Sequence, residues 1–372
     1  MTVSEPVVAP NDADQVDRGL ENSKMDVESP AGSGQEDGVV AAGTYKLRAV
    51  VKDPRMEPAL HAAYCHVKTS IPCSNLLLVL TKSTLTIYDD FHMGDHVAIV
   101  AQYVHEVEEG EEKTTLVSAT WIPGAVDSEK NAGSARILLA LSNGSLAVVD
   151  IIESRITQMF DGAFDASGYV LLAAPEAWVD GKEHVCVLGG DEVASVWNVA
   201  REERVGAIEK AVSAMAYAKG TLLVAYTASA GGGIGRHDAD GKLLVDKEMD
   251  GCAILDGEEI DSILPVEEGV CVLRGEREFR VWDMREGVIK SAFRLKETRD
   301  QSEVAFDANG TVAVLGTGDG DGYVFDVQSG EEIGQVSVVR VSSEVEAVAV
   351  SGDGRHIVLA ASGFLFRFLK EY

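Results

Sequence analysis

The 372-residue sequence predicts an all-β fold: a seven-bladed WD40 β-propeller with a disordered acidic N-terminal tail. The main observation is a repeat, in which seven short stretches of alternating apolar residues each close on a bulky or branched residue, usually followed by an acid. The closing residues are on average about 47 positions apart, close to the 40–45 residues of a WD40 blade. They are Tyr88, Val149, Trp197, His237, Trp282, Phe325 and Phe368.

The repeats share an internal order of strands and tight turns, which the sixth repeat shows clearly. Glu303–Phe306 alternates as an inner strand, and Asp307–Gly310 contains an Asn-Gly pair typical of hairpin turns. Thr311–Leu315 and Gly322–Val327 follow as the second and third strands. The closing residue of each repeat is therefore expected in the third strand of a four-stranded blade.

The last repeat lacks a fourth strand of its own. Glu344–Val350, His356–Ala360 and Phe364–Phe368 supply three strands, but too few residues follow Phe368 for another. Tyr45–Val51 alternates in the same way and lies just before the first inner strand. We expect Tyr45–Val51 to pair with the last blade, because this closes the ring and removes two open sheet edges.

Residues 1–44 are predicted to form the tail, and residues 45–372 the propeller. Through Ala42 the chain has nine acidic residues against Arg18 and Lys24, a net charge of −7, and no aromatic residue. Such a segment cannot bury enough apolar surface to offset its ordering entropy.

Composition limits the classes of partner. The 61 Asp+Glu outnumber the 32 Lys+Arg, so the net charge is −29, and such a surface repels nucleic-acid phosphates and anionic lipid headgroups. We therefore expect basic partners and no direct binding to nucleic acid or membrane. Five cysteines without short regular spacing favour a reducing compartment, and no secretory signal or membrane-length apolar run is visible, which predicts a soluble intracellular protein.

Candidate chemical sites are few, and the sequence predicts no enzyme activity, no cofactor and no metal. Gly231–Gly235 lacks the strand, helix and Lys-Ser/Thr context of a phosphate loop, so it is interpreted as a weak blade strand or a turn. Gly316–Gly322 lacks the bidentate Glu of a calcium loop and is interpreted as a hairpin turn. The residues that most nearly resemble a metal cluster are His61, Cys65, His66 and Cys73. Their spacing is irregular, and a strand is expected from Tyr64 to His66, so no metal site is predicted there. His92 and His96 form a separate pair in an expected loop, where a spacing of four residues does not bring two side chains together.

Two polar insertions lie between the first and second closing residues, at His105–Lys113 and Asp127–Ser134. The acidic part of the first, Glu106–Glu112, is either a solvated loop or a docking surface for a basic peptide, which long-range attraction would favour kinetically.

The region Ser83–Ile151 resembles the EED/ESC family, the WD40 subunits of the Polycomb repressive complex that methylates histone H3. The similar elements are Ile87-Tyr88-Asp89, Ala101-Gln102-Tyr103-Val104, the acidic loop, and Ala119-Thr120-Trp121 before an apolar strand. The last blade, with Ser351–Gly354 and Phe364–Phe368, also resembles that of the family. The resemblance implies a noncatalytic nuclear scaffold that holds a SET-domain methyltransferase and other Polycomb subunits.

The resemblance also implies a reader pocket for trimethyl-lysine on the histone H3 tail, built as an aromatic cage whose ring faces stabilise the quaternary ammonium. Alignment of the inner strands places the cage positions at Leu60, Val117, Ser302 and Glu303, none of which is aromatic. We therefore expect the scaffold role to be kept and the reader role to be lost. A WD40 adaptor of a different intracellular complex is the alternative, because this fold hosts many functions.

Overall fold

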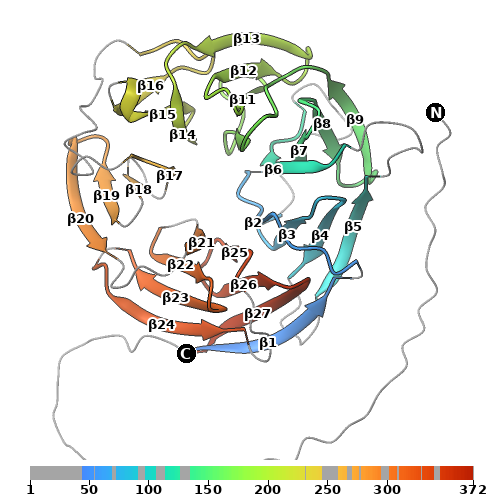
Figure 1. The fold of residues 1–372 in the computed structure, drawn as a ribbon, viewed down its shortest axis with the longest axis vertical. Coiled ribbons are helices and arrows are strands. Elements are labelled where there is room, and N and C mark those ends of the chain that lie inside the picture. Colours follow the sequence, from blue (N-terminus) through green and yellow to red (C-terminus); the bar gives the residue numbers. More distant parts are fainter. Residues whose placement is uncertain are drawn as a thin grey trace, which may run out of the picture. The chain divides into compact units, whose positions relative to one another are not determined.

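The computed structural model describes residues 44–53, 55–68, 73–90, 97–105, 114–125, 135–230, 232–244, 259–265, 270–275, 278–294, 301–307, 310–327, 329–338 and 344–371. Ala42–Tyr372 form one compact unit, in which seven antiparallel sheets are arranged as a ring (Figure 1). The predicted all-β fold, a seven-bladed WD40 β-propeller, is confirmed. The predicted tail lies outside the described residues, except that Thr44 already opens the first strand.

Each blade begins with its innermost strand, next to the centre of the ring. These strands are β2 (His61–Tyr64), β6 (Leu116–Ile122), β10 (Leu171–Ala173), β14 (Val212–Ala218), β17 (Ser262–Pro265), β21 (Gln301–Phe306) and β25 (Ala347–Val350).

The second strand of each blade pairs antiparallel with the innermost one and is mostly buried. These strands are β3 (Leu76–Leu80), β7 (Arg136–Leu141), β11 (His184–Leu188), β15 (Thr221–Tyr226), β18 (Val270–Arg274), β22 (Val312–Thr317) and β26 (His356–Ala361).

The third strands contain all seven closing residues found in the sequence, as expected. These strands are β4 (Thr84–Asp89), β8 (Leu146–Asp150), β12 (Ala194–Asn198), β16 (Gly233–His237), β19 (Glu278–Asp283), β23 (Asp321–Asp326) and β27 (Phe364–Glu371).

Outermost strands are described for six blades, and each makes a β-bulge opposite the closing residue of its third strand. A bulge at the same place in every such blade increases the local twist and so helps the sheets to curve around the ring. The outermost strands are β5 (Ala98–Val104), β9 (Arg155–Phe160), β13 (Glu203–Ile208), β20 (Val288–Arg294), β24 (Glu332–Ser337) and β1 (Thr44–Lys52).

The ring is closed by β1, the strand expected from Tyr45–Val51. It pairs antiparallel with β27 from Thr44 opposite Glu371 to Lys52 opposite Phe364, so the first and last strands share one blade (Figure 1). The Tyr45 hydroxyl also donates a hydrogen bond of 2.7 Å to the carbonyl oxygen of Gly354.

The fourth blade is described with three strands, β14, β15 and β16, and one 3₁₀ turn, η1 (Ala228–Ala230), while residues 245–258 lie outside the described part. Gly233–Gly235 of the glycine-rich run belong to β16, in agreement with the expected strand or turn.

The register confirms His237 as the closing residue of this blade. His237 is buried and pairs with Leu222 of β15, which faces the core with the third blade, just as Trp197 pairs with Val185 in the third blade. Asp238 follows it and accepts the N–H of Asp240 through Oδ1 at 2.9 Å.

Seven hydrophobic cores fill the seven spaces between neighbouring blades. Trp121 lies fully buried between the first two blades, and Trp282 lies almost fully buried between the fourth and fifth. Each core takes side chains from two sheets, so burial of apolar surface stabilises the ring only when the blades stand together.

The two ends of the ring differ in which strands of a blade are connected there. Every innermost strand begins at the end that we call the upper end, which also carries the turns between second and third strands. The lower end carries the turns from first to second and from third to outermost strands. In the described part, no helix has the length and apolar character needed to cross a membrane.

Candidate functional site

The four positions aligned with the aromatic cage lie at the upper end. Leu60 directly precedes β2, Val117 is the second residue of β6, and Ser302 and Glu303 follow the first residue of β21. Leu60 is half-buried and packs against the core between the first and second blades, whereas Val117 packs against the core between the second and third. The side chains of Ser302 and Glu303 lie outside the described part of the chain.

The aromatic residues that carry the EED/ESC resemblance serve the core. Tyr88 and Trp121 are buried, and Trp121 Nε1 donates a hydrogen bond of 3.1 Å to the carbonyl oxygen of Ala63. Tyr103 is half-buried against the core between the first two blades, and its hydroxyl lies 3.3 Å from His105 Nδ1. The acidic loop Glu106–Glu112 lies outside the described residues.

The strand expected from Tyr64 to His66 is wrong beyond Tyr64, because β2 ends at that residue. Cys65 and Cys73 are buried thiols whose mutual hydrogen bond, together with burial, raises the pKa of Cys65. His61 is half-buried, and desolvation and the neighbouring His66 lower its pKa to about 4. Within the described ranges no three His, Cys, Asp or Glu side chains are grouped as metal ligands.

The remaining sequence candidates give no pocket. Gly316–Gly322 spans the hairpin between β22 and β23, in which Gly316 pairs with Gly322 and the Gly320 N–H donates to the Thr317 carbonyl at 3.2 Å, as expected. His92 and His96 lie outside the described residues. The two best-formed cavities of the described part measure about 10 Å³ each, room for about one water molecule.

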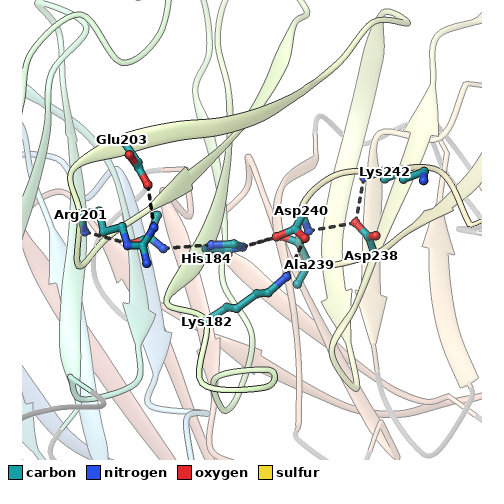
Figure 2. A network of polar contacts seen from close by, with 9 residues as sticks. Lys182, His184, Arg201, Glu203, Asp238, Ala239, Asp240 and Lys242 are labelled. Carbon is teal, nitrogen blue, oxygen red and sulfur yellow. Dashed lines mark hydrogen bonds and ion pairs between the residues drawn. The ribbon is translucent and has the colours of Figure 1, made fainter.

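At the lower end, a polar network joins the third and fourth blades (Figure 2). His184, the first residue of β11, is buried, and its Nδ1 lies 2.9 Å from the Ala239 carbonyl oxygen and 3.1 Å from Asp240 Oδ1. Its Nε2 lies 3.1 Å from the side-chain nitrogen of Asn198. A neutral imidazole with its proton on Nδ1 satisfies all three contacts. Lys182 donates to Asp240 at 2.6 Å, and this hydrogen bond lowers the pKa of Asp240.

The acid or amide that ends a third strand caps the following turn. Asp150 Oδ1 accepts the N–H groups of Ile152 and Glu153 at 2.8 and 3.0 Å. Asn198 and Asp326 accept N–H groups in the same way in the third and sixth blades. The acid seen after most closing residues in the sequence is thus explained by turn chemistry.

A buried ion pair joins the second and third blades at the lower end. Arg136 Nη2 lies 2.7 Å from Glu183 Oε2, and both side chains are almost fully buried. Arg136 Nε also donates to the Pro123 carbonyl at 3.1 Å, and the guanidinium lies 6.0 Å from the centroid of the Trp178 ring. These contacts replace part of the hydration that the guanidinium loses on burial.

The closure between the last and first blades is held by Asp90, which directly follows β4. Asp90 is ion-paired with Arg367 of β27, and both side chains are only 2% exposed. The Tyr64 hydroxyl donates to Asp90 Oδ2 at 2.5 Å, and His356 Nδ1 lies 2.7 Å from the same oxygen. Burial and the Asp90 carboxylate raise the pKa of Tyr64 well above its usual range. Three groups from two blades therefore converge on one carboxylate.

Ion pairs occur at both ends of the ring. Among the described residues, those at the upper end include Arg274–Asp261 and Arg280–Glu278, both in the fifth blade. Those at the lower end include Lys46 and Arg48 with Glu371, Lys68–Glu176, Arg136–Glu183, Arg155–Glu153, Lys182 and His184 with Asp240, Arg201–Glu203, Lys290–Asp283, and Arg367 and His356 with Asp90.

An exposed tyrosine that the sequence interpretation missed lies at the upper end, on the connection from β9 to β10. Asp165 O accepts the Gly190 N–H at 2.7 Å, which holds this connection against the turn between β11 and β12. A Cβ on Gly190 would lie only 2.3 Å from the nitrogen of Gly168, so the close approach requires glycine. Tyr169 follows and is 57% exposed, and partial burial and the carboxylates of Glu192 and Glu259 raise its pKa. The sequence signal was an aromatic residue directly after the small and polar stretch Asp165–Gly168.

Comparison with known proteins identifies the fold and not the family. No family model matches the sequence, and no curated protein matches it. Among solved structures, Raptor from Chaetomium thermophilum superposes with a TM-score of 0.65 and 11% sequence identity, over 90% of this chain. The aligned region is 30% of the Raptor chain. At this identity the likeness extends to the β-propeller fold alone.

Proposed function

We propose that this protein is a noncatalytic scaffold subunit that holds together a multiprotein complex. The observation that carries the proposal is the closed seven-bladed ring, with blades joined at the lower end by buried ion pairs. The two cavities described above, of about 10 Å³ each, have room for about one water molecule, whereas the two ends and the outer rim of the ring offer surfaces to protein partners.

The complex is proposed to be a Polycomb-type histone H3 lysine methyltransferase complex in the nucleus. The support is the resemblance of Ser83–Ile151 to EED/ESC proteins, together with the net charge of −29, which suits basic histone tails. The catalytic partner would be a SET-domain methyltransferase, and this chain would support its activity by holding it in place. The leucine and valine at two cage positions, Leu60 and Val117, support a scaffold without a methyl-lysine reader pocket.

Co-purification tests this proposal. The full chain, tagged at its native expression level, is isolated at physiological salt, and its partners are identified by mass spectrometry. We expect a SET-domain methyltransferase in an amount comparable to the tagged chain. Stable partners without any methyltransferase would overturn the Polycomb assignment and support an adaptor of another complex. Recovery of the chain with no stable partner would overturn the scaffold role itself.

A further inference from the structure

The outermost strand of the first blade, β5, differs in composition from the other outermost strands. Its sequence, Ala-Ile-Val-Ala-Gln-Tyr-Val, contains no charged residue. Each of the other five described outermost strands carries at least one Lys, Arg or Glu. Natural proteins place charges on edge strands because charges hinder pairing with the strand of another chain. The strand β5 lacks this protection.

The bulge in β5 exposes two apolar side chains next to each other. Ile87 pairs with Ala101 and Tyr88 pairs with Ile99, so Val100 is the extra residue of the bulge. Ile99 and Val100 are each 51% exposed. No other described outermost strand exposes two large apolar side chains at its bulge.

The outer edge of β5 also presents backbone groups to solvent. The strand order of this sheet is β2-β3-β4-β5, so β5 has a neighbouring strand on one side only. The His105 N–H donates to the Ser83 carbonyl at 2.8 Å, and successive residues of an antiparallel strand point alternately toward and away from the neighbour. The N–H and C=O groups of Gln102 and Val104 therefore point away from β4, and no described backbone group bonds to them.

The charge of the molecule favours a basic occupant of this edge. The net charge of −29 repels an acidic peptide and a second copy of the chain, and it attracts lysine and arginine. Along the chain, β5 is followed by the five glutamates of Glu106–Glu112. Since a chain spans at most about 3.5 Å per residue, Glu106 lies within about 7 Å of Val104. An extended segment in which apolar residues alternate with Lys or Arg therefore suits both the apolar side chains of the edge and the charge around it.

We propose that β5 binds an extended basic segment of a partner protein by β-strand addition. Main-chain hydrogen bonds to Gln102 and Val104 would supply affinity, and contacts with Ile99 and Val100 would select apolar residues in the partner. The site, Ala98–Val104, lies on the outer rim of the ring (Figure 1), whereas the positions aligned with the aromatic cage lie on or beside innermost strands. The inference goes beyond the proposed function, because it holds for any complex whose partner presents such a segment.

The test is a titration of the full-length protein into a fluorescent nine-residue peptide in which valine alternates with lysine, the valine–lysine peptide, followed by fluorescence anisotropy. We expect Val100→Lys to weaken binding about three- to tenfold, because its ammonium replaces an apolar contact and repels the lysines of the peptide. A fully N-methylated form of the peptide keeps its charges but lacks N–H donors, and it should bind at least as weakly.

The matched control is Val205→Lys, which adds the same charge to the third blade. Val205 is the extra residue in the bulge of β13 and is 37% exposed. Its neighbours in β13 include Glu203 and Arg204, so this edge already carries charges. The control is expected to bind the valine–lysine peptide within about twofold of the wild type.

Three outcomes would overturn the proposal. Equal weakening by Val100→Lys and Val205→Lys would indicate general attraction to an acidic protein. Undiminished binding of the N-methylated peptide would contradict strand addition. In sedimentation equilibrium of the protein alone, a dimer that Val100→Lys converts to a monomer would assign the edge to a second copy of the chain. None of these outcomes decides whether a methyltransferase co-purifies, so this inference and the proposed function fail independently.

Discussion

The lower and upper ends of the ring use charge in opposite ways. At the lower end, Asp90 and Arg136 are buried between blades and paired with groups of the neighbouring blade. At the upper end, Glu192 and Glu259 are exposed, and no described cation is ion-paired with either. Both ends are built from hairpin turns and loops that connect the same kind of strand, so the two ends differ in their side chains rather than in their backbone. This difference suggests that the lower end stabilises the ring and the upper end is available to partners.

The largest expected effect is the loss of the buried carboxylate at ring closure. Asp90→Ala removes the carboxylate that is ion-paired with the buried Arg367 guanidinium, which should lower the free energy of unfolding by about 3–5 kcal/mol. Urea unfolding followed by tryptophan fluorescence measures the change. The control is Glu153→Ala, which breaks an exposed pair with Arg155 and should cost less than about 1 kcal/mol. Equal effects for the two variants would contradict a special role for the closure.

The second buried pair should have a smaller but still large effect. Glu183→Ala leaves the Arg136 guanidinium buried, yet Arg136 keeps its bond to the Pro123 carbonyl and its contact with Trp178. We expect a loss of about 3 kcal/mol in the same urea experiment. A companion double variant, Arg136→Met/Glu183→Leu, should recover most of this loss, because it removes both charges and retains packing volume. If the double variant were as unstable as Glu183→Ala, packing rather than the unpaired charge would be responsible.

The sequence predicts features that depend on residues a few positions apart, and it does not predict contacts between residues that are far apart along the chain. The repeat gave the blades and the closing strand, because alternating apolar residues and turn residues act over a few positions. Even the fourth blade, where the closing residue is a histidine, keeps the expected register, with His237 opposite Leu222. The cluster of side chains around Asp90 was missed, because Asp90 and His356 stand 266 positions apart and neither residue type predicts the contact.

An acid titration tests the turn caps of the lower end. The Lys290 ammonium, helped by the N–H groups of Glu286 and Arg285, lowers the pKa of Asp283 to about 2. An unfolded aspartate titrates near pH 4, so the capped carboxylate stabilises the fold above about pH 4, and this contribution is lost as the pH falls to about 2. Asp283→Asn should therefore be less stable than the wild type at neutral pH, and the difference should shrink below pH 4. A difference that is constant with pH would contradict the assigned pKa.

The smallest expected effect concerns methylation. If the chain attracts basic tails by charge without an aromatic cage, histone H3 tail peptides with and without trimethyl-lysine should bind the full-length protein within about twofold of each other. Isothermal titration calorimetry measures both affinities. A clear preference for the trimethylated peptide would restore the reader role and place an aromatic pocket elsewhere in the chain.

The division of labour within the ring can be tested most directly by hydrogen–deuterium exchange of the full-length protein, with and without the valine–lysine peptide. Our account predicts that the peptide slows exchange in β5, most at the outward-facing N–H groups of Gln102 and Val104, which lie toward the upper end. It predicts no change in the turns 198–203 and 238–242 at the lower end, where side chains stabilise the ring. Protection at the lower end, or protection spread evenly over all blades, would contradict it.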